Sequence, residues 1–274
     1  MTSKTTIPVE THTIISAHLK REVIVDFFFA CNTLDPSQAI SLLLINDGQN
    51  MEELGLANIL ADLQHTNQLL PLLCVGIHCS EDRKNEYGTA AMKDFKGRGA
   101  KATLYTKFIF QELLPFIHKE STINRFKEKS FAGFSLGGLS ALDIVWANPA
   151  TFSKAGVFSG SLWWRTKALD DGYVEETDRI MHALIRKGDY NPGLKFFFET
   201  GTLDEAEDRN NNGIIDSIDD TLGLIDELVK KGYSKEKDIA YLELKEGRHD
   251  IATWAQAMPT FLTWAWGNAQ NNSL

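Results

Sequence analysis

Apolar residues along this chain form two kinds of run, which alternate from the N-terminus to the C-terminus. The unbroken apolar runs at 41–47 (SLLLIND) and 69–77 (LLPLLCVGI) predict strands that are covered on both faces, as in a mostly parallel sheet. Residues 14–19 and 23–29, joined by a polar turn around Lys20 and Arg21, predict an antiparallel edge. Further strands are predicted at 129–134, 154–160, 195–201 and 239–247.

Segments with helical spacing of apolar residues lie between these strands. They are 104–118, 139–146, 175–186, 222–231 and 251–266. The alternation predicts a three-layer α/β fold with a mostly parallel central sheet and an antiparallel N-terminal edge. Because 274 residues with 43% hydrophobic content can bury one large core, we expect a single domain over residues 1–274. The long segments 80–102 and 161–173 have no predicted core element and are candidates for shaping a binding site.

The charge balance narrows the classes of partner. There are 37 acidic and 28 basic residues, a net charge of -9, and no cluster of lysine and arginine of the kind that binds phosphates. We therefore predict no nucleic-acid partner. No segment has the apolar length that crosses a bilayer, and the start MTSKTTIPVETHT lacks the features of a secretory signal, so we expect a soluble, cytoplasmic protein without a membrane partner. Three cysteines without metal-type spacing indicate neither a disulfide framework nor a zinc site, and Cys74 is expected in the core.

A serine among glycines is the first candidate for chemistry. Residues 133–137 read GFSLG, between the predicted strand 129–134 and the helical run that follows. Glycines two before and two after a serine let strand and helix approach closely, so that the serine is held in a strained turn with its hydroxyl exposed at the edge of the sheet. The alternative is a glycine-rich turn that happens to contain Ser135.

Two further groups follow later strands in the order that a serine nucleophile requires. Asp204 follows the strand at 195–201, and His249 follows the strand at 239–247. A serine needs a base to remove its proton, and an imidazole needs a carboxylate to fix its tautomer. Because functional groups collect at the carboxyl ends of parallel strands, Ser135, Asp204 and His249 are predicted to form a catalytic triad. Three acids near Asp204 remain alternatives for the carboxylate: Glu205, Glu207 and Asp208.

Two backbone N–H groups are expected to stabilise the oxyanion. Leu136, directly after the serine, supplies one, and Gln49 in INDGQN (45–50) supplies the other from the loop after an earlier strand. The alternative for INDGQN is a simple Asp-Gly turn.

The order and spacing of five motifs resemble those of the esterase family of esterase D, feruloyl esterases and enterobactin-type siderophore esterases. The motifs are LLLINDGQN, GFSLGGLSAL, FSGSLWW, ETGTLDE and GRHDIATW. The resemblance extends from the first hairpin to the last helix. It implies an α/β-hydrolase fold and hydrolysis of a small-molecule carboxylic ester through an acyl-enzyme on Ser135, with the same triad and oxyanion donors and no cofactor. It also implies that Arg83 and Tyr87, in DRKNEYG (82–88), lie beside the active site. Here GFSLGG replaces the GHSMGG typical of S-formylglutathione hydrolases, which makes that substrate less expected.

Two other features have more than one interpretation. DRNNNGIIDSID (208–219) matches an EF-hand-like loop and predicts a structural Ca²⁺ or Mg²⁺ site, whereas the alternative is a turn that caps the following helix. The predicted cation ligands are Asp208, Asn210, Asn212, Ile214, Asp216 and Asp219. Trp163 and Trp164 are predicted either to line a substrate pocket or to pack a flap onto the core.

Two further functions use the same features. An acyltransferase would pass the acyl group from Ser135 to an alcohol instead of water, and a noncatalytic binding protein would use the fold alone. A complete set of nucleophile, base and acid favours the ester hydrolase.

Overall fold

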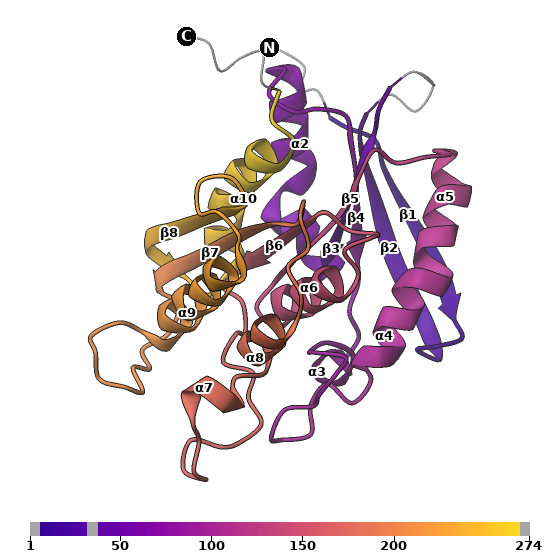
Figure 1. The fold of residues 1–274 in the computed structure, drawn as a ribbon. Helices are drawn as coiled ribbons and strands as arrows, with labels where there is room; N and C mark the ends of the chain where they lie inside the picture. Colours follow the sequence, from indigo (N-terminus) through magenta and orange to yellow (C-terminus); the bar gives the residue numbers. More distant parts are fainter. Residues whose placement is uncertain (1–5, 32–37, 269–274) are drawn as a thin grey trace.

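The computed structural model describes residues 6–31 and 38–268, and a single eight-stranded sheet runs through them (Figure 1). The strands are β1 (Val9–Ser16), β2 (Arg21–Ala30), β3 (Ser41–Asn46), β4 (Leu72–Ile77), β5 (Lys129–Phe134), β6 (Lys154–Phe158), β7 (Lys195–Leu203) and β8 (Ile239–Arg248). Their spatial order is β1-β2-β4-β3-β5-β6-β7-β8. β2 pairs antiparallel with β1 and β4, and the other neighbours pair in parallel. The predicted three-layer fold with an antiparallel edge is therefore confirmed.

Helices cover both faces of this sheet. They are α1 (Met51–Leu54), α2 (Leu56–His65), α3 (Arg83–Glu86), α4 (Ala102–Phe108), α5 (Leu114–Ser121), α6 (Leu136–Ala147), α7 (Glu175–Asp178), α8 (Ile180–Lys187), α9 (Asp216–Lys231) and α10 (Ile251–Trp266). Apolar side chains of α4, α5, α6, α8 and α9 share one core with the sheet, and those of α1, α2 and α10 share the other. None of these helices is long and apolar enough to cross a membrane.

The unbroken apolar strands are explained by these two cores. Leu42 and Leu44 of β3 point into the first core, whereas Leu43 and Ile45 point into the second, because successive side chains of a strand alternate between faces. All four are fully buried. Cys74 on β4 is likewise buried in the second core, as expected.

Some boundaries differ from the predictions. The helical segment 51–65 was not predicted, and Gly55, at φ 74°, divides it into α1 and α2. The helix predicted at 175–186 is interrupted at Arg179, whose extended backbone ends α7 and begins α8. The helix predicted at 104–118 contains a π-helical turn, Ile109–Leu113, just before Pro115, which lacks the N–H that a regular helix uses. The first strand runs from Val9 to Ser16 rather than over 14–19.

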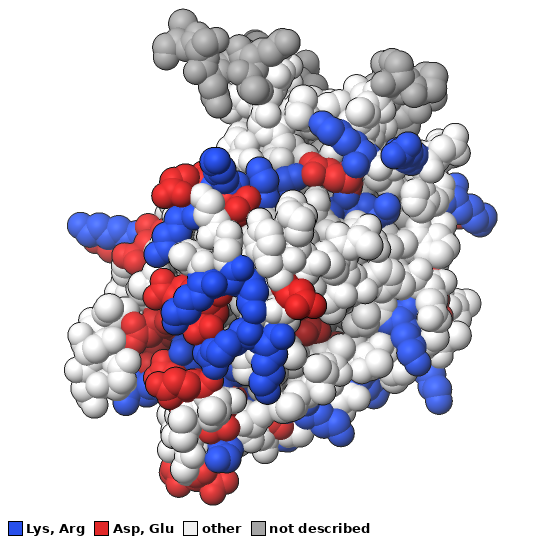
Figure 2. Space-filling model, in the orientation of Figure 1, with Lys and Arg blue, Asp and Glu red and all other residues white. Residues whose placement is uncertain are grey.

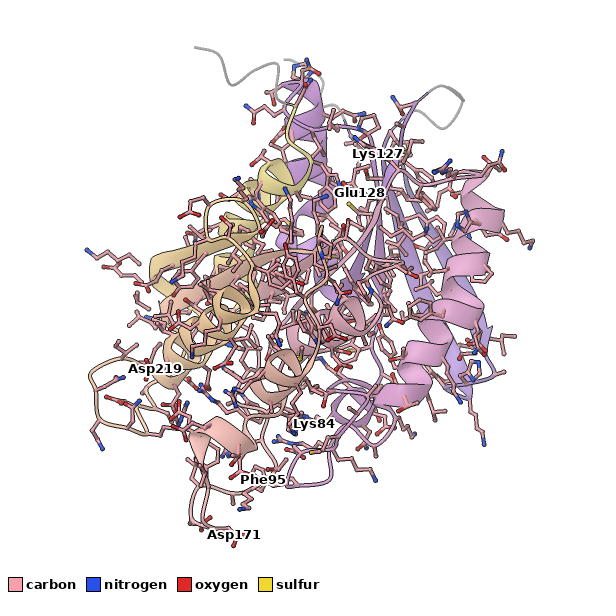
Figure 3. The ribbon with its side chains drawn as sticks, viewed as in Figure 1. Lys84, Phe95, Lys127, Glu128, Asp171 and Asp219 are labelled. Atoms are coloured by element: carbon pink, nitrogen blue, oxygen red, sulfur yellow. The ribbon has the colours of Figure 1, made fainter. Side chains whose placement is uncertain are left out.

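The carboxyl ends of the parallel strands meet at one edge of the sheet. Lys127 and Glu128, just before β5, lie at the opposite end of the molecule from Lys84 and Phe95 (Figure 3). Figure 2 shows acidic and basic side chains intermingled over α8 and α9, where Glu227 pairs with Arg186 at 3.0 Å and with Lys230 at 3.3 Å.

Candidate active site

Ser135 occupies a strained turn between β5 and α6. Its backbone has φ 54° and ψ −123°, a conformation that residues with a side chain rarely adopt. The close approach of strand and helix requires the neighbouring glycines: a Cβ at Gly133 would lie 2.4 Å from the carbonyl oxygen of Gly137. Ser135 remains partly exposed although the residues on both sides of it are buried. The sequence GFSLG therefore forms the tight turn that was predicted for a nucleophile.

The segment after β6 contacts the same turn. The Ser161 hydroxyl lies 3.3 Å from the Ser135 hydroxyl, and the Ser161 N–H donates to the Ser135 carbonyl at 3.0 Å. The Ser135 N–H in turn donates to the Phe158 carbonyl at 2.8 Å. Sequence reasoning did not single out Ser161, because a serine in a loop carries no signal of a partner 26 residues away.

Asp204 and His249 follow β7 and β8, which are neighbours in the sheet. The Asp204 carboxylate accepts a hydrogen bond from the Ser159 hydroxyl at 3.1 Å. The His249 ring packs edge-on against the Trp254 indole, with 5.4 Å between ring centroids. Among the described residues, no hydrogen bond joins His249 to Ser135 or Asp204. Active-site hydrogen bonds are often long without substrate and shorten when it binds, so this geometry is compatible with a triad.

Electrostatics nevertheless connects His249 with Asp204. Burial lowers the pKa of His249, and the negative charge of Asp204 opposes that effect. Burial raises the pKa of Asp204, while the Ser159 hydrogen bond and His249 favour its ionised form. The pair is thus an acid and a base that stabilise each other's charge in a partly dry site.

The three rival acids lie differently. None of these acids (Glu205, Glu207 and Asp208) is among the charges that shift the pKa of His249. Asp208 instead accepts the N–H groups of Asn212 and Gly213 within its own loop, at 3.1 and 2.9 Å. The geometry favours Asp204, and the triad assignment stays a prediction.

The loop after β3 is fixed by charged and aromatic side chains. Arg83 on α3 donates two hydrogen bonds of 2.7 Å to the Asp47 carboxylate, and the Asp47 N–H donates to the Tyr87 hydroxyl at 3.2 Å. A Cβ at Gly137 would lie 2.6 Å from the Asp47 carboxylate, so this loop rests directly on α6. These contacts bring the loop that contains Gln49 to the start of the nucleophile helix.

Both predicted oxyanion donors lie in the first turn of a helical segment. Gln49 lies in the short 3₁₀ helix Gly48–Asn50, and Leu136 is the first residue of α6. The first N–H groups of a helix have no partner within it, so they are available to an anion. The Gln49 side chain accepts the Cys79 N–H and donates to the Cys79 sulfur, both at 3.1 Å. Because the side chain is engaged, the backbone N–H of Gln49 is the group predicted to bind the oxyanion. The roles of Gln49 and Leu136 stay predictions.

Residues 16–265 match the sequence profile of the family described as "Putative esterase". The chain belongs to this esterase family. A curated relative, the iron(III) salmochelin esterase of Escherichia coli, is 29% identical over 150 residues, which cover 53% of this chain and 34% of the relative. The chain therefore matches about a third of the length of that protein.

Solved structures of other esterases share the fold. The enterobactin esterase of Shigella flexneri superposes with a TM-score of 0.72 at 22% identity, covering 95% of this chain and 59% of that one. A siderophore hydrolase of Aspergillus nidulans gives a TM-score of 0.66 at 15% identity, covering 93% and 94% of the two chains. A ferulic acid esterase gives 0.67 at 14% identity, covering 94% and 98%.

In this member of the esterase family, the residues predicted to line a substrate pocket are not equally accessible. Tyr87 and Trp164 are fully buried. Tyr87 packs edge-on against Tyr105 with 5.2 Å between ring centroids, and Trp164 packs so closely on Gly88 that a Cβ there would lie 2.8 Å from the indole. Both residues therefore stabilise the loop 80–102 from within.

Trp163 and Arg83 remain partly exposed. Trp163 borders a cavity of about 250 Å³, and the Arg98 guanidinium lies 4.9 Å from its ring centroid. The cavity lies where the segments 80–102 and 161–173 meet, because the Phe95 N–H donates to the Arg165 carbonyl at 3.0 Å. Its walls include aromatic, basic and acidic side chains: Phe95, Lys96, Arg98, Trp163, Arg165, Leu169, Glu205, Glu207 and Asp216.

The predicted cation loop is ordered by its own side chains. Asn210 and Asn212 both donate to one oxygen of Asp219, at 2.8 and 2.7 Å, and Asn212 accepts the Ile214 N–H at 2.7 Å. Asp219 lies in the first turn of α9 (Figure 3).

Asp216 differs from the other predicted ligands of this loop. Its carboxylate accepts the Arg209 N–H at 2.8 Å and pairs with the Arg209 guanidinium at 3.2 Å. Within residues 6–31 and 38–268, no three His, Cys, Asp or Glu side chains are grouped so as to hold a metal ion. The loop brings Asp208, Asn210, Asn212 and Asp219 together, and cation binding stays a prediction.

Proposed function

We propose that this protein hydrolyses carboxylic esters through an acyl-enzyme on Ser135. The Ser135 oxygen attacks the ester carbonyl carbon while His249 takes the hydroxyl proton, and the resulting oxyanion is stabilised by the N–H groups of Leu136 and Gln49. When the tetrahedral intermediate collapses, His249 returns the proton to the departing alcohol. Water then attacks the acyl carbon by the same sequence and releases the acid.

The observation that carries this proposal is the conformation of Ser135. A partly exposed serine held at φ 54° between β5 and α6, at the edge where Asp204 and His249 follow β7 and β8, is costly for a merely structural turn. Asp204 fixes the imidazole and offsets its charge when His249 is protonated. Membership in the esterase family independently supports ester hydrolysis.

The test is hydrolysis of a p-nitrophenyl ester by wild type, Ser135→Ala and Ser130→Ala. Ser130 is a buried serine on β5 and serves as the matched control. We expect Ser135→Ala to lose about a thousandfold to a millionfold in kcat and Ser130→Ala to keep wild-type kcat. Wild-type turnover by purified Ser135→Ala would contradict the mechanism.

We further propose that the acyl or alcohol group of the substrate is aromatic. The enterobactin esterase of Shigella flexneri was solved with enterobactin and with 2,3-dihydroxy-N-benzoyl-serine. Here the rings of Phe95 and Trp163 offer stacking surfaces to an aromatic group. The guanidinium groups of Arg98 and Arg165 offer donors to its phenolic oxygens, in a cavity that carboxylates also line.

Trp163→Ala tests this substrate class. We expect it to raise KM for feruloyl and dihydroxybenzoyl esters by about tenfold while changing KM for an acetyl ester little, since loss of an aromatic contact costs about 0.5–1.5 kcal/mol beyond its buried area. Tyr190→Ala, an exposed aromatic residue outside this cavity, is the control. Equal effects of Trp163→Ala on aromatic and acetyl esters would contradict the assignment.

A further inference from the structure

A second carboxyl group lies behind Asp204. Glu199 on β7 is fully buried, and its Oε2 atom lies 3.5 Å from the Ser159 hydroxyl oxygen that donates to Asp204 at 3.1 Å. The Trp254 indole N–H also donates to this oxygen, at 3.0 Å. One serine hydroxyl is therefore shared by an indole and two carboxyl groups.

The number of hydrogens at this hydroxyl limits its arrangement. A serine hydroxyl donates one hydrogen bond and accepts two. Since Trp254 can only donate, Ser159 has one hydrogen for two carboxyl groups. If both were ionised, the Ser159 hydroxyl could donate to only one of them. If Glu199 carries a proton, it donates to Ser159, Ser159 donates to Asp204, and every bonding position of the hydroxyl is used.

Ser159 is held in place for this role. It directly follows β6, its backbone has φ 42°, and its N–H donates to the Glu199 carbonyl at 2.8 Å. A positive φ at a residue other than glycine is strained and persists where the surroundings require it. Ser161, two residues later, contacts Ser135, so the segment 159–161 connects the acid with the nucleophile.

The charged groups around Glu199 favour its neutral form. Burial raises the pKa of Glu199 to about 8, the charge of Asp204 acts in the same direction, and the hydrogen bonds from the Ser159 N–H and hydroxyl oppose these two effects. From β8, Tyr241 is the titratable group near Glu199, and it is paired with Thr200 at 2.7 Å. From α10 the uncharged Trp254 donates to Ser159 rather than to Glu199, and no basic side chain of the described residues pairs with Glu199. Asp204 is more exposed and lies near His249, so it keeps the negative charge.

We propose that Glu199 remains protonated at neutral pH and, through Ser159, orients the Asp204 carboxylate toward His249. Glu199 and Ser159 are then positioning residues, which hold one oxygen of Asp204 and leave Oδ2, which has no hydrogen-bond partner in the described part of the chain, free for the imidazole. This inference rests on the proposed function, in which Asp204 serves His249.

Ser159→Ala and Glu199→Gln test the inference kinetically. Ser159→Ala should lower kcat about tenfold to a hundredfold with little change in KM, and should shift the acid limb of the pH profile because Asp204 no longer supports the charge of His249. Glu199→Gln, a neutral isostere, should keep kcat at neutral pH and stay active in the alkaline range where wild type declines as Glu199 ionises. Ser130→Ala and Asp143→Asn, a buried acid on α6, are matched controls with wild-type profiles.

Two readouts are independent of activity. Infrared difference spectra of wild type against Glu199→Gln should show a protonated carboxyl band that disappears as the pH rises through about 8. Because the folded state favours the protonated form, Glu199 stabilises wild type most at acid pH, and this contribution is lost as the pH rises from the ordinary value of 4.5 through about 8. The melting temperature of Glu199→Gln should therefore rise relative to that of wild type as the pH increases over this range.

The outcomes separate the two proposals. Hydrolysis by wild type together with an unchanged kcat and pH profile in Ser159→Ala would overturn the positioning role. Absence of the protonated carboxyl band at neutral pH would overturn the protonated state of Glu199 whether or not the protein hydrolyses esters. A wild type without ester hydrolysis that still shows the band would contradict the proposed function alone.

Discussion

At the scale of single residues, His249 determines how the reaction depends on pH. The imidazole accepts the Ser135 proton only when it is neutral, and burial lowers the pKa of His249 below its ordinary value. A lowered pKa keeps the base neutral at more acidic pH. We therefore expect the acid limb of kcat/KM to lie below the ordinary imidazole pKa of 6.5. A pH–rate profile from wild type measures this limb, and a midpoint above 6.5 would contradict His249 as the base in this environment.

The identity of the acid is a second question at this scale. Asp204→Asn should lower kcat up to about ten-thousandfold, because the amide stabilises neither the required tautomer nor the charge of the imidazole. Glu205→Gln and Asp208→Asn are the matched substitutions in the same loop and should cost far less. Steady-state kinetics of the three variants shows which carboxylate is the acid. A loss at Glu205 or Asp208 that equals or exceeds the loss at Asp204 would show that another carboxylate is the acid.

The sequence predicts single residues of the site only where they lie in a local pattern. Ser135 stands out because glycines at 133 and 137 flank it, and His249 because it follows a strand. Ser159, Ser161 and Glu199 were missed because their partners lie far along the chain: 45 residues separate Ser159 from Asp204, and 95 separate it from Trp254. Such contacts exist only once the strands are assembled.

At the scale of elements, the strands were easier to predict than the helices. All eight strands of the described residues were predicted, and β3 and β4 most clearly, since their apolar residues face two cores and form unbroken runs. The break between α7 and α8 was not predicted, because Arg179 is held there by a hydrogen bond of 2.9 Å to Asp220 on α9. No local pattern reveals a guanidinium that pairs with a carboxylate 41 residues later.

The loop before α9 provides a prediction at the same scale. Calcium should raise the melting temperature of chelator-treated protein, since a ligand that binds only the folded state stabilises it by mass action. Asp219→Ala should cancel the rise, because this carboxylate is where the Asn210 and Asn212 side chains converge. Asp226→Ala, on the exposed face of α9, is the control.

A helix-capping loop without a cation predicts a different calorimetric result. Removing the capping side chain would then cost on the order of 1 kcal/mol, and calcium would leave the melting temperature of every variant unchanged. Unchanged melting of wild type at millimolar calcium would rule out the cation.

At the scale of the whole molecule, the sheet gathers groups that are far apart in the sequence. The ends of β3, β5, β6, β7 and β8 supply Gln49, Ser135, Ser159, Asp204 and His249. A TM-score of 0.72 at 22% identity to the enterobactin esterase of Shigella flexneri shows that the arrangement of elements persists although most side chains differ. The fold explains why these groups meet at one edge, and the chemistry depends on the side chains themselves.

The most direct test of the central claim is covalent labelling of the native protein with a fluorophosphonate, followed by mass spectrometry of the digested product. The reagent forms a stable bond with a serine that an adjacent base has activated. The account predicts one modified peptide, with the label on Ser135, and loss of labelling in both Ser135→Ala and His249→Ala. A folded wild-type protein that takes up no label, or that takes it up on a serine other than Ser135, would contradict the account.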